Sequence, residues 1–177
     1  SNTDGHRRSR RLLHFLRSAF VSFEIIDLPM LAALSREAEA TPRRRKNLNF
    51  HAGDASRCAR LVYAVAEGSY VRPHRHLDPE KGETVLCLRG RFGLLFFADD
   101  GTVSATRVIA AGSDCLGVNV APGTWHSLLA LEPESVFFEA KAGPYCPLSP
   151  AETAAWAPAE NTAEAIAYEA RLRRLFD

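Results

Sequence analysis

The sequence predicts an all-β domain, a barrel or jelly roll with helices only outside it. Short runs of apolar and β-branched residues recur between about residue 48 and residue 146, separated by turn-forming Gly, Pro, Asn and Asp. Strands this short at regular spacing are typical of a β-barrel or β-sandwich. Patterns with helical periodicity and capping residues occur only before and after that stretch.

Length and charge exclude several classes of protein. A chain of 177 residues that is 46% hydrophobic can bury one core and is too short to expect two domains. With 22 basic against 21 acidic residues and a net charge of +1, the composition indicates neither a nucleic-acid partner nor an acidic membrane. The sequence contains no apolar run near the ~18 residues of a membrane span and no clear secretory leader, so we expect a soluble, cytoplasmic protein.

Cysteine usage agrees with a reducing compartment. The 4 cysteines are far apart and include no C-x-x-C pair, which argues against a zinc ribbon or a thioredoxin-type motif. We therefore expect free, buried thiols at Cys58, Cys87, Cys115 and Cys146.

The chain divides into three segments. Residues 1–22 are a basic extension that we expect to be loosely ordered, residues 23–147 form the main domain with an N-terminal helix, and residues 148–177 form a C-terminal helical segment. Asp27 and Pro29 open the first helix, which runs to about Ala40.

Positively charged residues follow the first helix. The run Arg43–Lys46 is either a solvated face or an anion clamp at a cavity rim, since Arg suits phosphate and carboxylate.

Strands are expected at about 59–66, 84–88, 93–97, 103–109, 115–120, 128–131 and 135–141. Arg89-Gly90-Arg91 and Asp99-Asp100-Gly101 are read as hairpin turns. The last helix runs from Thr162 to Phe176, and its apolar residues are expected to dock on the domain or on a second subunit. These residues are Ile166, Leu172 and Leu175.

Four residues have the chemistry of a metal site. Successive strand side chains point to opposite faces, so His74 and His76 project to the same side. Glu83 follows after a loop, and a Pro-Gly turn presents His126 on a later strand. Three neutral imidazoles and one carboxylate leave an open position on one divalent transition metal ion, such as iron, zinc, nickel or manganese.

The spacing of these residues resembles the two motifs of the cupin superfamily. Gly68-x5-His-x-His and Glu83-x6-Gly match the first motif, and Gly123-x2-His matches the second. The gap between His76 and the carboxylate is longer than usual, and Glu80 would shorten it. Glu83 is preferred because it stands seven residues before Gly90, as the motif requires, whereas the same step from Glu80 reaches Cys87. Ala121 and Ala130 depart from the second motif at positions that are not ligands.

A closer resemblance is to the WbuC family of cupin-fold metalloproteins, over about residues 23–160. It is carried by four blocks in order, namely Pro42–His51, the His74/His76 stretch, Pro122–His126 and Phe138–Tyr145. The resemblance implies a cupin jelly roll and a metal. That family occurs in bacterial polysaccharide (O-antigen) gene clusters, and its reaction is not established.

Three functions stay open. The first is a metal-dependent enzyme acting on a small polar or anionic, sugar-like ligand, and the second is a cupin that binds metal and ligand without turnover. The third, a metal-free sugar epimerase, would leave His76, Glu83 and His126 without a shared purpose. The candidate ligand-binding residues, each of which also has an ordinary structural interpretation, are His51, Tyr70, Arg72, Lys141 and Tyr145. Because an open jelly roll leaves edge strands, we also expect a homodimer.

Overall fold

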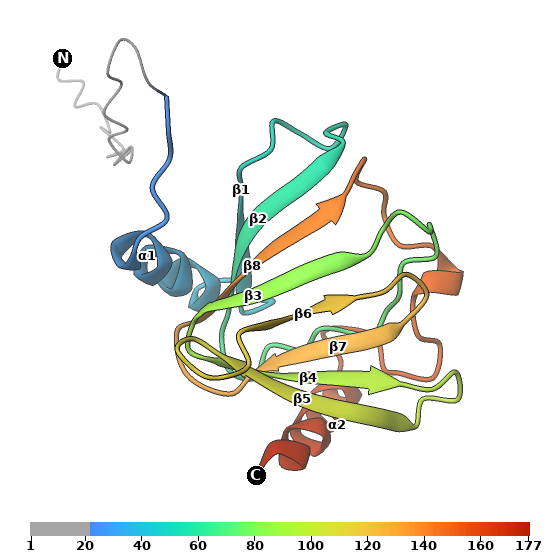
Figure 1. The fold of residues 1–177 in the computed structure, drawn as a ribbon. Helices are drawn as coiled ribbons and strands as arrows, with labels where there is room; N and C mark the ends of the chain where they lie inside the picture. Colours follow the sequence, from blue (N-terminus) through green and yellow to red (C-terminus); the bar gives the residue numbers. More distant parts are fainter. Residues whose placement is uncertain (1–21) are drawn as a thin grey trace, which may run out of the picture.

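Two antiparallel sheets face each other in the computed structural model, which describes residues 22–177. The first helix covers the outside of the larger sheet and the last helix lies beside the smaller one (Figure 1). The basic extension expected over residues 1–22 lies outside the described residues, apart from its final position.

The sheet order is that of a jelly roll. The larger sheet runs β1 (Arg45–Asn49), β2 (Cys58–Val65), β8 (Ser135–Ala142), β3 (Glu83–Arg89) and β6 (Gly117–Val120). The smaller sheet runs β5 (Val103–Ala110), β4 (Arg91–Phe97) and β7 (Trp125–Ala130). Strands far apart in sequence, such as β2 and β8, are neighbours, and the helices lie outside the two sheets. The predicted all-β jelly roll with flanking helices is confirmed.

Gly90 joins the two sheets and does not close a hairpin. β3 pairs with β6 and β8, whereas β4 pairs with β5 and β7, so the hairpin expected at this glycine is wrong. Gly90 has a positive φ of 70°, and a Cβ there would overlap the Ser135 side chain. The second expected hairpin, around Gly101, does join β4 to β5.

The first helix, α1 (Leu28–Glu39), begins as expected. The Asp27 carboxylate accepts a hydrogen bond from the Met30 N–H, which caps the helix. Its apolar stripe of Leu31, Leu34 and Ala38 packs on Val62, Ala64 and Val136 of the outer sheet face. The residues of β2 that alternate with Val62 and Ala64, such as Tyr63, therefore face the interior between the sheets.

The C-terminal helix docks on the domain through Leu172 alone of its three expected apolar residues. α2 (Ala163–Arg173) continues into the 3-10 turn η2 (Arg174–Phe176), and Leu172 is buried, whereas Ile166 and Leu175 are exposed. Phe176 lies against Gly93 of β4, where a Cβ would come within 2.6 Å of the ring. The inward face follows the helical spacing of Ala165, Glu169, Leu172 and Phe176, which includes one charged residue.

The thiols are free but mostly not buried. Cys87 is the buried one, and Cys58, Cys115 and Cys146 are exposed, so the expected burial is wrong for three of them. Among residues 22–177, no helix is long and apolar enough to cross a membrane.

Candidate metal centre

The four predicted ligands converge at one end of the space between the sheets. One side-chain ligand atom each from His74, His76, Glu83 and His126 lies within 4.8 Å of all the others. Glu83 is the first residue of β3 and His126 the second residue of β7, so the group bridges the two sheets.

Backbone hydrogen bonds fix the two histidines that precede β3. The His74 N–H donates to the His126 carbonyl at 3.0 Å, and the His126 N–H donates to the His74 carbonyl at 2.9 Å. This segment forms isolated bridges and not the strand expected, because Pro73 has no N–H to extend the ladder. The Gly123 N–H donates to the His76 carbonyl at 2.7 Å, which ties the Pro-Gly turn to the second histidine.

The imidazoles are oriented for coordination. Nδ1–H of His126 donates to the Thr124 carbonyl at 2.8 Å, and Nδ1–H of His74 donates to the Arg72 carbonyl at 3.1 Å. A carbonyl can only accept, so these contacts assign the proton to Nδ1 and leave Nε2 with a free lone pair.

Two of the ring nitrogens lack a hydrogen-bond partner. Nε2 of His126 lies 2.8 Å and Nε2 of His76 lies 3.2 Å from the Glu83 carboxylate oxygens. These are ion-pair distances, yet both nitrogens are buried and neither makes a properly oriented hydrogen bond. An unpaired buried polar atom costs free energy. Nitrogens that converge with a carboxylate in this way fit a bound cation.

Burial and mutual contacts shift the pKa values of three residues in the group. Burial lowers the pKa of His74 to about 3, which keeps this ring neutral. Burial would raise the pKa of Glu83, but the His126 and His76 rings and the Lys141 ammonium outweigh it and hold that pKa well below its usual range. Burial would lower the pKa of His126, but the Glu83 carboxylate outweighs it and raises that pKa.

The structure also separates the two candidate carboxylates. Glu83 is 5% exposed and faces the histidines. Glu80 lies in an exposed loop, where its N–H donates to the Asp78 carboxylate. The longer gap to Glu83 therefore brings the carboxylate to the histidines.

Lys141 and Glu139 extend the polar group along β8. Lys141 Nζ lies 3.2 Å from Glu83 and 3.0 Å from Glu139. Burial would lower the pKa of Lys141, but the two carboxylates outweigh it and raise that pKa. Burial and the charge of Glu83 raise the pKa of Glu139, a residue that was not among the predicted site residues.

A cavity of about 590 Å³ opens beside this group and lies over β1, β2 and β8. Its volume is in the range of small-molecule sites. His51, Arg72, Lys141 and Tyr145 line it, as expected for ligand-binding residues. Arg72 also donates to the Ala154 carbonyl, and a His51 ring nitrogen accepts from the Arg60 N–H.

Tyr70 does not line the cavity, which corrects its prediction as a ligand-binding residue. Its hydroxyl donates to the Pro158 carbonyl at 3.0 Å and its ring packs edge-on against Tyr168. Burial raises its pKa above the usual value. Alternation along a strand would place Tyr70 on the same face as His74 and His76, but residues 66–73 form no strand.

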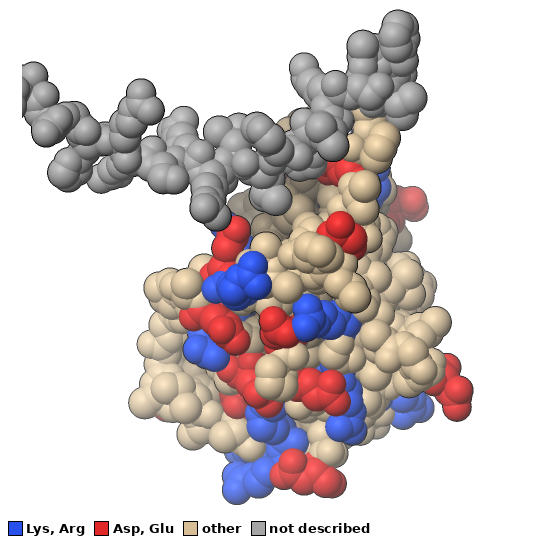
Figure 2. Space-filling view, turned by 90° about the vertical axis from the view of Figure 1, so that its left-hand side faces the viewer, with Lys and Arg blue, Asp and Glu red and all other residues tan. Residues whose placement is uncertain are grey.

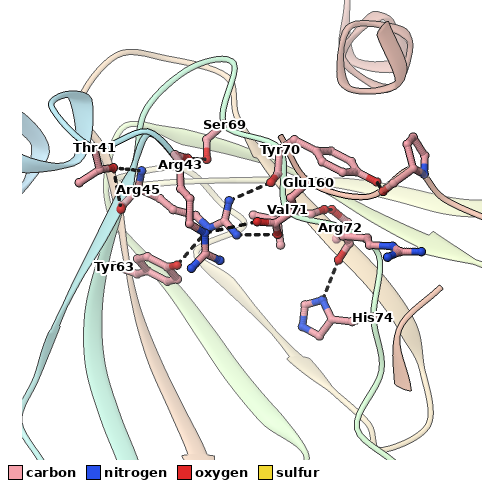
Figure 3. A network of polar contacts seen from close by, with 12 residues as sticks. Thr41, Arg43, Arg45, Tyr63, Ser69, Tyr70, Val71, Arg72, His74 and Glu160 are labelled. Atoms are coloured by element: carbon pink, nitrogen blue, oxygen red, sulfur yellow. Dashed lines mark hydrogen bonds and ion pairs between the residues drawn. The ribbon is translucent and has the colours of Figure 1, made fainter. Parts of the chain in front are cut away.

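The basic run Arg43–Lys46, which overlaps the start of β1, contains a buried residue that the sequence did not single out. The Arg45 guanidinium donates to the Tyr70 carbonyl, the Tyr63 hydroxyl and the Glu160 carboxylate (Figure 3). Arg43 contacts the same carboxylate at 3.3 Å. Arg45 is thus neither solvated nor free to clamp an anion. Arg45 is the first residue of β1, a strand that was not among those expected, and alternation along the strand projects its side chain to the same face as those of Asn47 and Asn49.

The face shown in Figure 2 carries no large patch of purely positive or purely negative side chains among the described residues. There, Lys and Arg side chains lie among Asp and Glu side chains over the described part of the chain. This mixture agrees with the net charge of +1.

Comparisons with known proteins address only the broad class. A family model described as a domain of unknown function (DUF6016) matches residues 26–109. No curated protein matches the chain.

Several solved structures are similar in outline. KdgF from Halomonas sp. shares 15% identity at a TM-score of 0.46, over 59% of this chain and 83% of that one. The conserved SPY1581 protein of unknown function from Streptococcus pyogenes shares 14% identity at a TM-score of 0.49, over 73% of this chain and 95% of that one. The Lactobacillus farciminis oxalate decarboxylase formate complex shares 20% identity at a TM-score of 0.44, over 58% of this chain and 28% of that one. The fold assignment therefore rests on the sheet order, and the likeness to the WbuC family stays a prediction.

Proposed function

We propose that the protein is a metal-binding cupin that acts on a small polar or anionic, sugar-like ligand. His74, His76, Glu83 and His126 would hold one divalent transition metal ion. The observation that carries the proposal is the pair of buried, unpartnered Nε2 atoms of His76 and His126 facing the Glu83 carboxylate. A metal-free epimerase would leave both atoms without a partner.

Charge supports an anionic ligand. The cavity is lined by four cationic side chains (Arg43, Arg45, Arg72 and Lys141) and four carboxylates (Asp54, Glu83, Glu139 and Glu160). These charges cancel, so a divalent ion would leave the lining with a formal charge of +2. A site of this kind favours ligands with a carboxylate or a phosphate.

Both the bound ion and the protein's side chains would contribute to the chemistry of such a site. A bound divalent ion polarises a ligand oxygen at its open position. Lys141 would face the ligand's negative charge, and Glu139, whose pKa is raised by burial and by the charge of Glu83, lies 3.0 Å from the Lys141 ammonium. The resemblance of the four motif blocks to the WbuC family supports a ligand from bacterial surface polysaccharide metabolism.

The decisive experiment is elemental analysis of protein purified without added metal. His76→Ala should abolish most metal binding because it removes one of the converging ligands, whereas Glu80→Ala should leave it nearly intact because Glu80 lies in the exposed loop. At about a hundred times the dissociation constant, metal should add about 2.7 kcal/mol to the free energy of unfolding of the unmodified protein.

The pH dependence of metal binding provides a further arm of this test. Imidazoles must be neutral to bind a metal, and the Glu83 carboxylate raises the pKa of His126 above its ordinary value, so protons should compete with the metal and occupancy should fall as the solution is made mildly acidic. The proposal fails if the unmodified protein takes up no stoichiometric metal at neutral pH. If Glu80→Ala strips the metal and Glu83→Ala does not, the assignment of the carboxylate is wrong.

A further inference from the structure

Two asparagines of β1 face the cavity opposite the metal ligands. Asn47 and Asn49 lie two residues apart on this edge strand, so their side chains project to one face, and both line the cavity. The Asn47 amide Nδ2 donates to Asn49 Oδ1 at 2.7 Å. Each amide therefore orients the other, although both residues are exposed to the open side of the cavity.

The pair keeps hydrogen-bonding groups free for a ligand. Once Asn47 Nδ2 donates to Asn49 Oδ1, the Asn47 carbonyl oxygen remains as an acceptor and the Asn49 NH2 as a donor. Exchanging oxygen and nitrogen in both amides again leaves one acceptor and one donor. Within residues 22–177, neither side chain makes another hydrogen bond. Adjacent hydroxyls of a sugar present the complementary donor and acceptor.

Strand pairing places these amides at a useful distance from the metal ligands. Asn49 pairs with Leu61 of β2, which pairs with Glu139 of β8, so two strand spacings separate Asn49 from Glu139 by about 10 Å. Lys141, two residues beyond Glu139, pairs with Glu83. Between the two polar ends, Ala59 and Leu61 give the cavity an apolar floor on which the C–H face of a sugar ring can rest.

We propose that the ligand is a polyhydroxylated anion, with its negative group at the metal ligands and Lys141 and two adjacent hydroxyls on the Asn47/Asn49 amide pair. The inference rests on the proposed function and adds the hydroxyl subsite on β1. A carboxylate and a phosphate would be recognised by the same chemistry at the anionic end.

Matched probes test the subsite in the zinc-loaded full-length protein by isothermal titration calorimetry. D-glucuronate carries ring hydroxyls and a carboxylate, cyclohexanecarboxylate carries the carboxylate alone, and D-glucose carries the hydroxyls alone. α-D-glucose 1-phosphate and cyclohexyl phosphate form the phosphate arm. In at least one arm, the hydroxylated anion should bind about tenfold or more tightly than its hydroxyl-free counterpart, and glucose should bind weakest. The arm with tighter binding identifies the anionic group.

Variants assign this discrimination to the amides. Asn47→Ala combined with Asn49→Ala should weaken binding of the hydroxylated anion about tenfold and leave the hydroxyl-free anion and the zinc content unchanged. Asn119→Ala is the matched control, because Asn119 is an exposed asparagine on β6, the opposite edge strand of the same sheet, and bonds Thr84 away from the cavity. It should change none of these values.

The outcomes separate this inference from the proposed function. If the protein binds zinc but the hydroxylated anions bind no better than their counterparts, or bind not at all, the hydroxyl subsite is wrong while the metal site stands. Discrimination that survives the double asparagine variant also overturns the subsite. Failure to take up any of zinc, iron, nickel or manganese overturns the proposed function itself.

Discussion

Arg45 shows how a charged side chain becomes structural in this protein. Its guanidinium is nearly inaccessible, with 4% of the side chain exposed, and it contacts a carboxylate, a tyrosine hydroxyl and a backbone carbonyl. Arg43, two residues earlier, meets the same Glu160 carboxylate with 57% of its side chain exposed. Burial, and not charge, distinguishes the two arginines.

Replacing each arginine with Ala should therefore have unequal effects. Arg45→Ala should lower the free energy of unfolding by about 3 kcal/mol, because it leaves buried acceptors and part of the Glu160 charge unpaired. Arg43→Ala should cost less than about 1 kcal/mol, since solvent screens an exposed pair. Urea denaturation measures both values, and equal losses would contradict this account.

Among the elements, the segment that carries His74 and His76 depends on its neighbours. It forms no strand of its own, and the 3-10 turn η1 (Pro150–Glu152) fastens it: the Glu152 carboxylate accepts from the Leu77 N–H at 3.0 Å. The same carboxylate accepts from the Ser149 N–H and hydroxyl. These hydrogen bonds lower the pKa of Glu152 to about 2.

This contact should make stability depend on pH in acid. A carboxyl whose pKa is lowered on folding stabilises the folded state above its ordinary pKa of 4.5, and this contribution is lost as pH falls toward about 2. Glu152→Gln should cost about 1 kcal/mol at neutral pH, as for loss of a cap. The difference from the unmodified protein should vanish across that acidic range in urea denaturation. A similar loss for Glu80→Gln, in the exposed loop, would show that the effect is not specific to Glu152.

Helix α2 offers a test of which face docks on the sheet. Leu172 is 3% exposed and packs with residues of β4 and β7, whereas Ile166 is 74% exposed. Leu172→Ala should lower the free energy of unfolding by about 3 kcal/mol because it opens a cavity. Ile166→Ala should stay within about 0.5 kcal/mol of the unmodified protein. A large loss for Ile166→Ala would instead indicate a partner on the outer face, such as a second subunit.

At the scale of the whole molecule, the prediction of a homodimer remains to be tested. β1 and β6 are the edges of the larger sheet, and large apolar side chains are exposed at Phe23, Ile25, Ile26 and Leu28. Proteins cover or pair such edges, so sedimentation should show a dimer at high micromolar concentration. A monomer at that concentration would contradict the prediction.

The division of the chain into residues 23–147 and 148–177 likewise stays a proposal. The C-terminal segment supplies Ala154, Ala157 and Leu172 to a buried cluster with Leu95 and Trp125. Thr153 and Glu160 of this segment also line the cavity.

Local patterns in the sequence determined most of the short strands, the helix cap at Asp27 and the four converging residues His74, His76, Glu83 and His126. Each of these depends on residue type and spacing along the chain. Tertiary structure alone decided the sheet change at Gly90, the exposure of Ile166, the removal of Tyr70 from the cavity and the burial of Arg45. The physical reason is that these features depend on which strand lies beside which, and partners such as β2 and β8 are far apart in the sequence.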